Sequence, residues 1–352
     1  MITDTVENYD LFAWDGATTE VNVDNEPLVW RNFKEGEFTH LEPGKGYLYA
    51  NKNNVILSFI GTPYTGNGIV DLTYDAENES ACLNLVGNPY AETATIDGNR
   101  SFYTMNSDGD KFIATTNNTI EAMEGIFVVA VSEGDQLTFS TIEGEIGGEP
   151  LDPDKGNLVL NLSHRNALID RAIVRFDEGG QLPKFQFKPN DTKVYIPQEG
   201  KDYAVVRGSE MGEMPVSFKA ESNGTYNMSF PAEKVSFNYL HLIDNMTGTD
   251  VDLLVNPSYT FDAQTTDYAS RFKLVFATGS NSDDSFSFYS NGSFIISNEG
   301  EAVLQVVDVT GRILNNETIN GSANVHVNAA PGVYMLRLIN GDNVKVQKVV
   351  VR

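Results

Sequence analysis

The sequence has only one cysteine and no long hydrophobic run. With Cys82 alone, neither an intramolecular disulfide framework nor a cysteine-based zinc cluster can form. No run approaches the ~20 apolar residues that a helix needs to cross a bilayer, so we expect no transmembrane segment. Residues 1–10 are acidic and lack the basic and apolar regions of a signal peptide. We therefore expect either that a signal has been removed or that the chain belongs to a longer protein extending upstream of Met1.

Basic residues are also scarce. The chain has 24 Lys and Arg against 49 Asp and Glu, a formal net charge of −25. Such an excess repels phosphate backbones and anionic membranes, so we expect no nucleic-acid partner. The low cysteine count does not indicate a cytosolic location, since many secreted bacterial proteins dispense with disulfides. The acidity favours solubility and leaves calcium as a candidate ligand.

Recognisable catalytic motifs are missing as well. The chain has four histidines, none of them paired at metal-ligand spacing: His40, His164, His241 and His326. There is no Gly-x-Ser-x-Gly elbow, and Cys82 lies in an apolar stretch typical of a core residue. Carboxylates abound, but nothing in the sequence places two of them around a cleft. We therefore expect no catalysis by this chain.

What the sequence does contain is a series of short β-type runs. They are rich in Val, Ile, Phe and Tyr, are bounded by Gly, Asn, Asp or Pro, and recur about every 10 residues. Examples are residues 54–61, 125–131, 136–141, 157–163, 172–176, 203–207, 272–277, 302–309 and 333–338. No window shows the periodicity of an amphipathic helix. The pattern predicts an all-β fold of tandem antiparallel β-sandwich modules, with no helix longer than about three turns.

Two segments rich in Gly, Pro, Ser and acids interrupt this pattern. They span residues 143–157 and 277–287 and have almost nothing to bury, as expected of linkers. The chain should therefore divide into residues 1–146, 155–278 and 286–352.

The first segment contains a faint internal repeat. Residues 41–50 (LEPGKGYLYA) align with 120–129 (IEAMEGIFVV), and each copy runs into an expected strand that contains Phe, at 55–62 and 136–141. The second copy is preceded by a strand that breaks at Gly-Asn-Pro, residues 87–89, and the first copy is not. We interpret the first copy as lacking its opening strand; chance similarity between the two stretches is the alternative.

The sequence of the last segment predicts two specific turns and a shared core. Asp308 can accept backbone N–H groups in a turn that Gly311 closes with positive φ. Pro331 and Gly332 then lead into another strand, and we expect Gly332 also to need positive φ. Residues expected to form a shared core are Leu304, Val306, Tyr334, Leu336 and Leu338. Cations concentrate near the end as a local basic patch, with Lys345 and Lys348 expected to be exposed.

Three ordered matches in this segment resemble the C-terminal sorting domain of type IX secretion cargo. They are VVDVTGRIL (306–314), APGVYMLRL (330–338) and NVKVQKVVVR (343–352). The resemblance implies a small Ig-like sandwich recognised by the secretion machinery of the outer membrane, and a final location outside the cell or on its surface. The signal residues that it implies are Asp308, Gly311, Arg312, Pro331, Gly332, Tyr334, Lys345 and Lys348. The two earlier segments resemble, more loosely, β-modules of large secreted, adhesin-like proteins.

Two other kinds of site are worth testing. Aromatic residues crowd the first segment and could form a ligand face: Trp14, Trp30, Tyr47, Tyr49 and Tyr90. Asp152 and Asp154 lie at alternate positions before Gly156, a fragment of a calcium-loop pattern without the distal bidentate Glu. Residues 106–112 are similar. Core packing explains most of the aromatics, and an ordinary Asp-Gly turn explains each acidic stretch.

These observations predict a non-catalytic, surface-anchored C-terminal region whose modules adhere to host matrix or glycan or present an upstream region. The alternative is an accessory region of a secreted hydrolase, a protease or glycosidase, whose catalytic domain lies before residue 1. A complete carbohydrate-active enzyme would require a carboxylate pair in a cleft.

Overall fold

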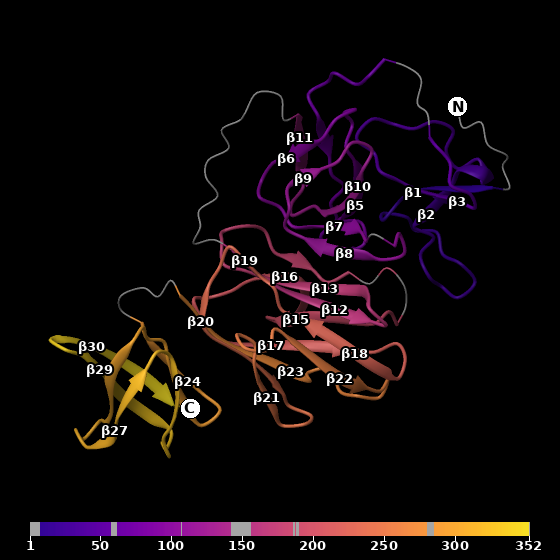
Figure 1. The fold of residues 1–352 in the computed structure, drawn as a ribbon. Coiled ribbons are helices and arrows are strands. Elements are labelled where there is room, and N and C mark those ends of the chain that lie inside the picture. The colour runs from indigo at the N-terminus through magenta and orange to yellow at the C-terminus, as the bar shows by residue number, and fades with distance from the viewer. Residues whose placement is uncertain are drawn as a thin grey trace. The chain divides into compact units, whose positions relative to one another are not determined.

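The computed structural model describes residues 8–57, 62–106, 108–141, 156–185, 187, 190–279 and 285–351. These residues form β-strands joined by turns (Figure 1), and their one helical element is the 3-10 turn η1 (Phe33–Glu35). The all-β prediction is confirmed. The chain divides into two compact units: residues 1–149 with 179–182, and residues 150–178 with 183–352.

The first unit contains three small sheets. One has the order β2 (Trp30–Asn32), β1 (Tyr9–Trp14), β3 (Tyr47–Asn51). The second has the order β5 (Leu83–Gly87), β10 (Gly125–Val129), β7 (Phe102–Met105), β8 (Phe112–Thr115). The third has the order β4 (Ile69–Asp71), β11 (Gln136–Thr141), β6 (Ala94–Ile96), β9 (Thr119–Ile120). The second and third sheets share one apolar core that includes Phe102, Ile126, Leu137 and Phe139.

The internal repeat has a structural counterpart. β3 pairs with β1 and β1 with β2, just as β10 pairs with β7 and β7 with β8. The prediction of a strand at 55–62 is wrong for residues 55–57, the part of it that the structure mainly describes. Val55, Ile56 and Leu57 form no strand and are exposed. Its counterpart β11 is held on both sides by β4 and β6. In the described residues, Val55–Leu57 have no such neighbours, and a strand without partners leaves its backbone groups unpaired.

Gly46, in the first copy of the repeat, lies where the backbone comes very close to β5. The Gly46 N–H donates to the Leu85 carbonyl at 3.0 Å. A Cβ at Gly46 would lie 2.7 Å from Leu85 Cγ and 2.8 Å from the Val86 carbonyl oxygen. The turn therefore needs glycine there for space, and this contact joins the first copy of the repeat to β5.

The second unit begins with a large curved sheet. Its path runs β21 (Thr249–Asp252), β20 (Phe237–Asp244), β23 (Phe272–Thr278), β17 (Met211–Lys219), β15 (Lys193–Gln198), β16 (Lys201–Arg207), β13 (Ala167–Arg175), β12 (Asn157–His164), β18 (Gly224–Ser229), β22 (Ser258–Ala263). Two short strands, β14 (Leu182–Pro183) and β19 (Ala232–Glu233), lie off this path. The described pairings are antiparallel except that of β13 with β16. The sheet folds over a core that includes Leu160, Val206, Phe218, Leu242 and Phe272.

This core contains a buried ion pair. Arg271 Nη2 lies 2.8 Å from Asp244 Oδ2, with both side chains at most 2% exposed. The Tyr259 hydroxyl donates to Asp244 at 3.0 Å, and Arg271 Nη1 donates to the Asp262 carbonyl at 2.7 Å. The guanidinium also lies 4.7 Å from the ring centroid of Phe261. Burial is tolerated because each charge has a full set of partners.

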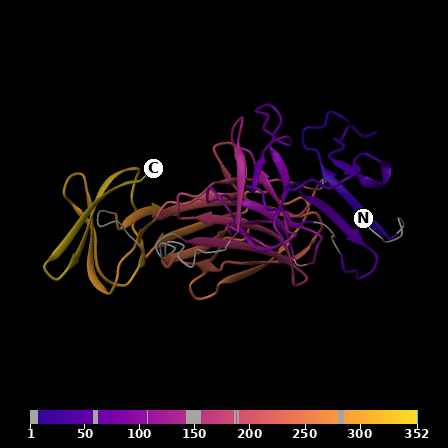
Figure 2. The same cartoon turned by 90° about the horizontal axis from the view of Figure 1, so that it is seen from above.

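The last seven strands form a separate sandwich (Figure 2). One sheet has the order β24 (Ser287–Ser290), β25 (Ser293–Ile296), β28 (Ala323–His326). The other has the order β27 (Ile313–Asn320), β26 (Glu301–Asp308), β29 (Gly332–Asn340), β30 (Asn343–Val351). Phe294 and Ile296 from the first sheet pack against residues of the second, and the five predicted core residues, Leu304, Val306, Tyr334, Leu336 and Leu338, are all buried there.

The three-stranded sheet of this sandwich is covered on both faces. Its residue Ile295, at 2% exposed, packs with Tyr239, Val275 and Ala277 of the large sheet in a small apolar cluster, against which Phe288 also packs. Every residue of β25 is buried as a result. The four-stranded sheet makes no comparable cluster with the large sheet among the described residues, so its outer face is free within this unit.

Candidate functional site

The turn between β26 and β27 is organised by one carboxylate. Asp308 Oδ1 accepts hydrogen bonds from the Thr310 N–H at 2.9 Å, the Thr310 hydroxyl at 2.6 Å and the Arg312 N–H at 3.0 Å. Its Oδ2 accepts from Arg312 Nε at 3.1 Å. Gly311 has φ of 85°, as expected. The predicted turn chemistry of Asp308 and Gly311 is therefore confirmed.

These bonds make the turn sensitive to acid. The Thr310 hydroxyl, then the backbone N–H groups and the Arg312 side chain, lower the pKa of Asp308 to about 2 against the effect of burial. Since the folded pKa lies below the unfolded value of about 3.9, the stabilisation is fully present above that value and is lost as pH falls toward 2. We expect hydrogen exchange in β26 and β27 to accelerate over that window.

The Asp308→Asn variant tests this expectation. It should weaken the acid dependence, because its amide accepts the same N–H groups but carries no charge to titrate. Asp342→Asn, at an exposed position in the β29–β30 turn, serves as the matched control and should leave the acid dependence as in the wild type. An unchanged acid dependence in Asp308→Asn would show that another group controls this turn.

The Pro331-Gly332 entry into β29 differs from the expectation. Gly332 does not have positive φ; it begins the strand in an extended conformation, and a Cβ there would make only ordinary contacts, the nearest at 3.8 Å from the Ala330 carbonyl oxygen. The prediction for Gly332 was wrong because a Pro-Gly pair can enter a strand directly. Tyr334 instead fixes this corner, since its buried ring places the hydroxyl 2.7 Å from the Ala330 carbonyl.

We expect the two glycines to respond differently to substitution. Gly311→Val forces a β-branched residue into the left-handed region and should cost about 1–3 kcal/mol of stability. Gly332→Val places valine in a strand and should cost less than about 1 kcal/mol. Local hydrogen exchange in β26 and β29 measures both, each variant serving as the other's control. Equal losses would contradict the backbone assignment.

The basic patch is divided between two faces. Lys345 and Lys348 are exposed on β30, as expected. Lys348 lies opposite Met335 in register and Lys345 lies opposite Leu338. Because directly opposite residues share a face, Lys348 projects from the outer face of the sheet and Lys345 from the inner face, on the edge strand β30.

The five aromatics proposed as a ligand face do not share one. Trp14 and Trp30 lie opposite each other in register, and both contact the Phe127 ring, with centroids 5.1 and 6.1 Å away. Tyr47 and Tyr49 project from the other face of the same sheet, since Tyr47 pairs with Ala13, next to Trp14. Tyr90 lies elsewhere, against Tyr64. The two tryptophans are packing residues between the copies of the repeat.

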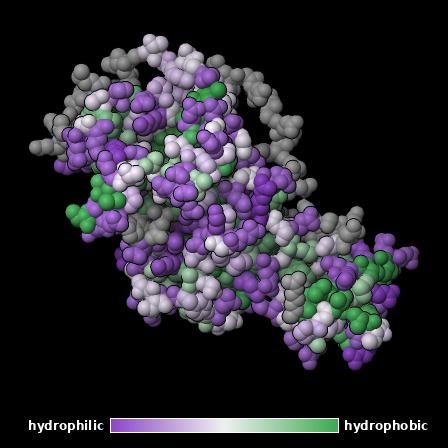
Figure 3. Space-filling view, turned by 180° about the vertical axis from the view of Figure 1, so that it is seen from behind, coloured by the Kyte–Doolittle hydropathy of each residue, from purple (hydrophilic) through white to green (hydrophobic). Residues whose placement is uncertain are grey.

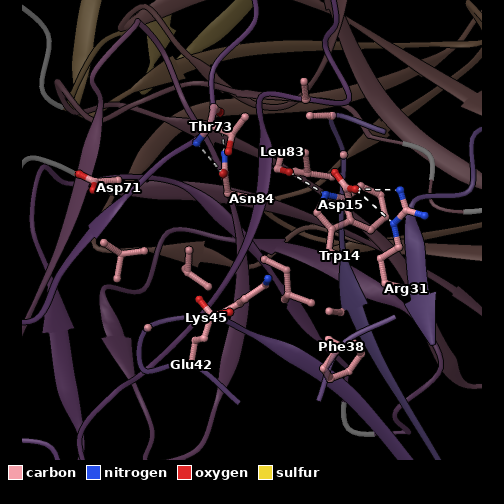
Figure 4. Close-up of a pocket in the computed structure, with 18 of the residues that line it drawn as sticks. Trp14, Asp15, Arg31, Phe38, Glu42, Lys45, Asp71, Thr73, Leu83 and Asn84 are labelled. Carbon is pink, nitrogen blue, oxygen red and sulfur yellow. Dashed lines mark hydrogen bonds and ion pairs between the residues drawn. The ribbon is translucent and has the colours of Figure 1, made fainter. Parts of the chain in front are cut away.

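A hollow of about 750 Å³ lies beside the first sheet (Figure 4). Arg31 enters it and is held by Asp15 at 3.0 Å and Glu20 at 2.5 Å, which together raise the pKa of the guanidinium above its usual range. On the other side, Asn84 accepts from the Thr73 N–H and donates to the Thr73 carbonyl. Arg31 and Asn84 are thus each held by partners within the hollow.

The two candidate calcium sites have different outcomes. Asp152 and Asp154 lie outside the described residues. At 106–112, Asn106 accepts from the N–H groups of Asp110 and Lys111, and Gly109 has φ of 71°, the geometry of a turn closed by a side chain. Within the described ranges, no three His, Cys, Asp or Glu residues are grouped as metal ligands.

Comparison with known proteins identifies the last segment. Residues 290–352 match the family model of the secretion system C-terminal sorting domain. The chain thus carries the sorting domain of a type IX secretion cargo, which implies contact with the secretion machinery, export, and association with the outer membrane or cell surface. This is the class of protein that the terminal sandwich and its sequence pattern define.

Other comparisons add little. No curated protein matches the chain. Among solved structures, it is similar to dimeric latent PorU from Porphyromonas gingivalis with 12% identity and a TM-score of 0.15, covering 77% of this chain and 32% of that one. The chain therefore spans about a third of that protein's length, and a likeness of this size carries no argument. No helix in the described residues is long and apolar enough to cross a membrane.

Proposed function

We propose that this cargo is a non-catalytic adhesin-like protein whose first unit contacts a host matrix protein. The observation that carries this proposal is a hydrogen-bonded hairpin that presents a fully exposed valine at its tip. Asn22 Oδ1 accepts from the N–H groups of Asp24 and Glu26, both at 2.9 Å, and the Asn22 N–H donates to the Glu26 carbonyl at 2.8 Å. Val23, at the tip, is 100% exposed and Val21 is 47% exposed.

The hairpin favours a protein ligand over a glycan. Sugars are bound by the faces of aromatic rings, and Trp14 and Trp30 are packed against Phe127. A preorganised valine tip instead suits an apolar pocket on another protein, since a rigid loop loses little entropy on binding. In the hollow, the pairing of Arg31 with Asp15 and Glu20 supports a structural role for that arginine and is consistent with a non-catalytic unit.

Binding to immobilised matrix proteins, such as fibronectin and collagen, tests the proposal. We expect saturable binding by the purified chain, and loss of about tenfold in affinity for Val23→Ser. Val131→Ser is the matched control, because Val131 is also strongly exposed, at 72%, in the same unit. Hydrolysis of protein or polysaccharide substrates by the pure chain, binding to glycan arrays alone, or equal effects of the two variants would overturn the proposal.

A further inference from the structure

The outer face of β29 and β30, in the four-stranded sheet of the sorting domain, is unusually apolar. Outward-facing positions of an antiparallel sheet that meets water are normally polar. Here the outer positions of β29 and β30 expose Met335 at 37%, Val344 at 49%, Val346 at 52% and Val350 at 51%. Figure 3 shows apolar surface gathered on this terminal sandwich. Exposed apolar surface of this kind marks an interaction site.

Two cations lie among these apolar side chains. Arg337 pairs in register with Val346, and Lys348 with Met335, so both project from the outer face. Arg337 Nη1 donates to Gln305 Oε1 at 3.0 Å, on the neighbouring strand β26. The outward positions of β26, β29 and β30 carry one carboxylate, Glu301, at the end of β26. The face is therefore apolar and cationic on a chain whose net charge is −25.

We propose that this outer face is the surface by which the sorting domain docks on the secretion machinery. The partner surface that fits it is an apolar protein patch carrying carboxylates opposite Arg337 and Lys348. The geometry supports this choice of face, because Ile295 and Phe288 of the other sheet are already packed against the large sheet. The inference rests on the sorting-domain match and is independent of the adhesive role of the first unit.

Charge argues against two other occupants of this face, a second copy of the chain and an anionic lipid surface. A second copy docked face to face would bring Arg337 and Lys348 toward the same cations, and like charges close together oppose association. An anionic lipid surface would repel the acidic body of the chain, and two cations supply only about 2 kcal/mol of attraction to it. An acidic protein surface has neither disadvantage.

Display of the full chain on type IX-competent cells tests the proposal. We expect Val346→Glu and Lys348→Glu each to lower the surface-displayed fraction at least about tenfold, since each places a carboxylate against the acidic partner. Val255→Glu is the matched control, because Val255 is a strongly exposed valine, at 72%, in the turn between β21 and β22 and away from the sorting domain. Unchanged display of either face variant with an intact fold would overturn the proposal. Failure of the wild-type chain to be displayed would instead contradict the sorting assignment.

Two measurements on the purified chain separate the remaining outcomes. Hydrogen exchange in β26 and β29 verifies that each variant is folded; if Val346→Glu is not, Lys348→Glu decides, since it alters only an exposed side chain. Sedimentation with vesicles of phosphatidylglycerol and phosphatidylethanolamine, and the oligomeric state in solution, complete the test. Vesicle binding or dimerisation that Lys348→Glu abolishes would overturn the proposal in favour of lipid or of a second copy.

Discussion

A chain that ends at Thr278 will be synthesised and cross the inner membrane when given a signal peptide, but it will accumulate in the periplasm of a type IX-competent cell. The reason is structural. Residues 285–351 hold a complete core of their own, with Leu304 and Leu336 buried between two sheets, and the matching family is defined as a sorting domain. Fractionation with antibody labelling of intact cells measures the outcome, which should be near-complete loss of surface signal.

The converse experiment uses a passenger. A soluble protein that carries a signal peptide and residues 279–352 should reach the surface, and the same passenger without that segment should stay in the periplasm. Truncation also uncovers Tyr239, Val275 and Ala277, which Ile295 covers in the intact chain, so periplasmic protease resistance must be compared with that of the full chain. Normal surface display of the truncated chain would refute the sorting function of the segment.

Arg271→Met should destabilise the large sheet by about 3–5 kcal/mol. The substitution leaves the Asp244 carboxylate buried without its partner, and an uncompensated buried charge costs this much. Burial alone would raise the pKa of Asp244, but hydrogen bonds from Arg271, the Met246 N–H and Tyr259 hold it below its usual range. Without Arg271, that carboxyl should take up a proton at higher pH, and the loss of stability should shrink as pH falls.

Hydrogen exchange in β20 and β23 is the suitable measurement. Both tryptophans lie in the other unit, so tryptophan fluorescence would not report on the large sheet. Exchange in these strands should accelerate by roughly two to four powers of ten if it follows the stability change. Arg207→Met is the matched control, since Arg207 and its partner Glu178 are 49% and 89% exposed, and such pairs contribute at most about 1 kcal/mol. Comparable acceleration in the two variants would contradict a special role for the buried pair.

Local patterns were enough to predict much of the fold. The alternation of Leu304 and Val306, and of Tyr334, Leu336 and Leu338, gives the inner faces of β26 and β29 directly, because side chains alternate along any strand. The Asp308 turn could be predicted equally well, because all hydrogen-bond partners of the carboxylate lie within four residues of it. Gly332 shows the limit of such reasoning, because the Pro-Gly pair was compatible with both a left-handed turn and a direct entry into a strand.

Features that depend on pairing between distant strands could not be predicted. Asp244 and Arg271 lie 27 residues apart, and nothing in the sequence selects them from many acids and bases. The aromatics of the first segment appeared as one group, yet the register of β1 with β2 and β3 places Trp14 and Tyr47 on opposite faces. The outer apolar face depends on the register of β29 with β30, which the sequence does not specify, although the alternating valines of β30 are present in it.

The single thiol gives the chain a built-in reporter of its folding state during export. Cys82 is 8% exposed, and its sulfur donates to the Asp75 carbonyl at 3.1 Å. A buried thiol is shielded from alkylating reagents, and it becomes reactive when the surrounding strands open. Brief maleimide labelling of periplasmic intermediates would therefore mark only those molecules whose first unit is still open, and would date the folding of that unit relative to its passage across the outer membrane.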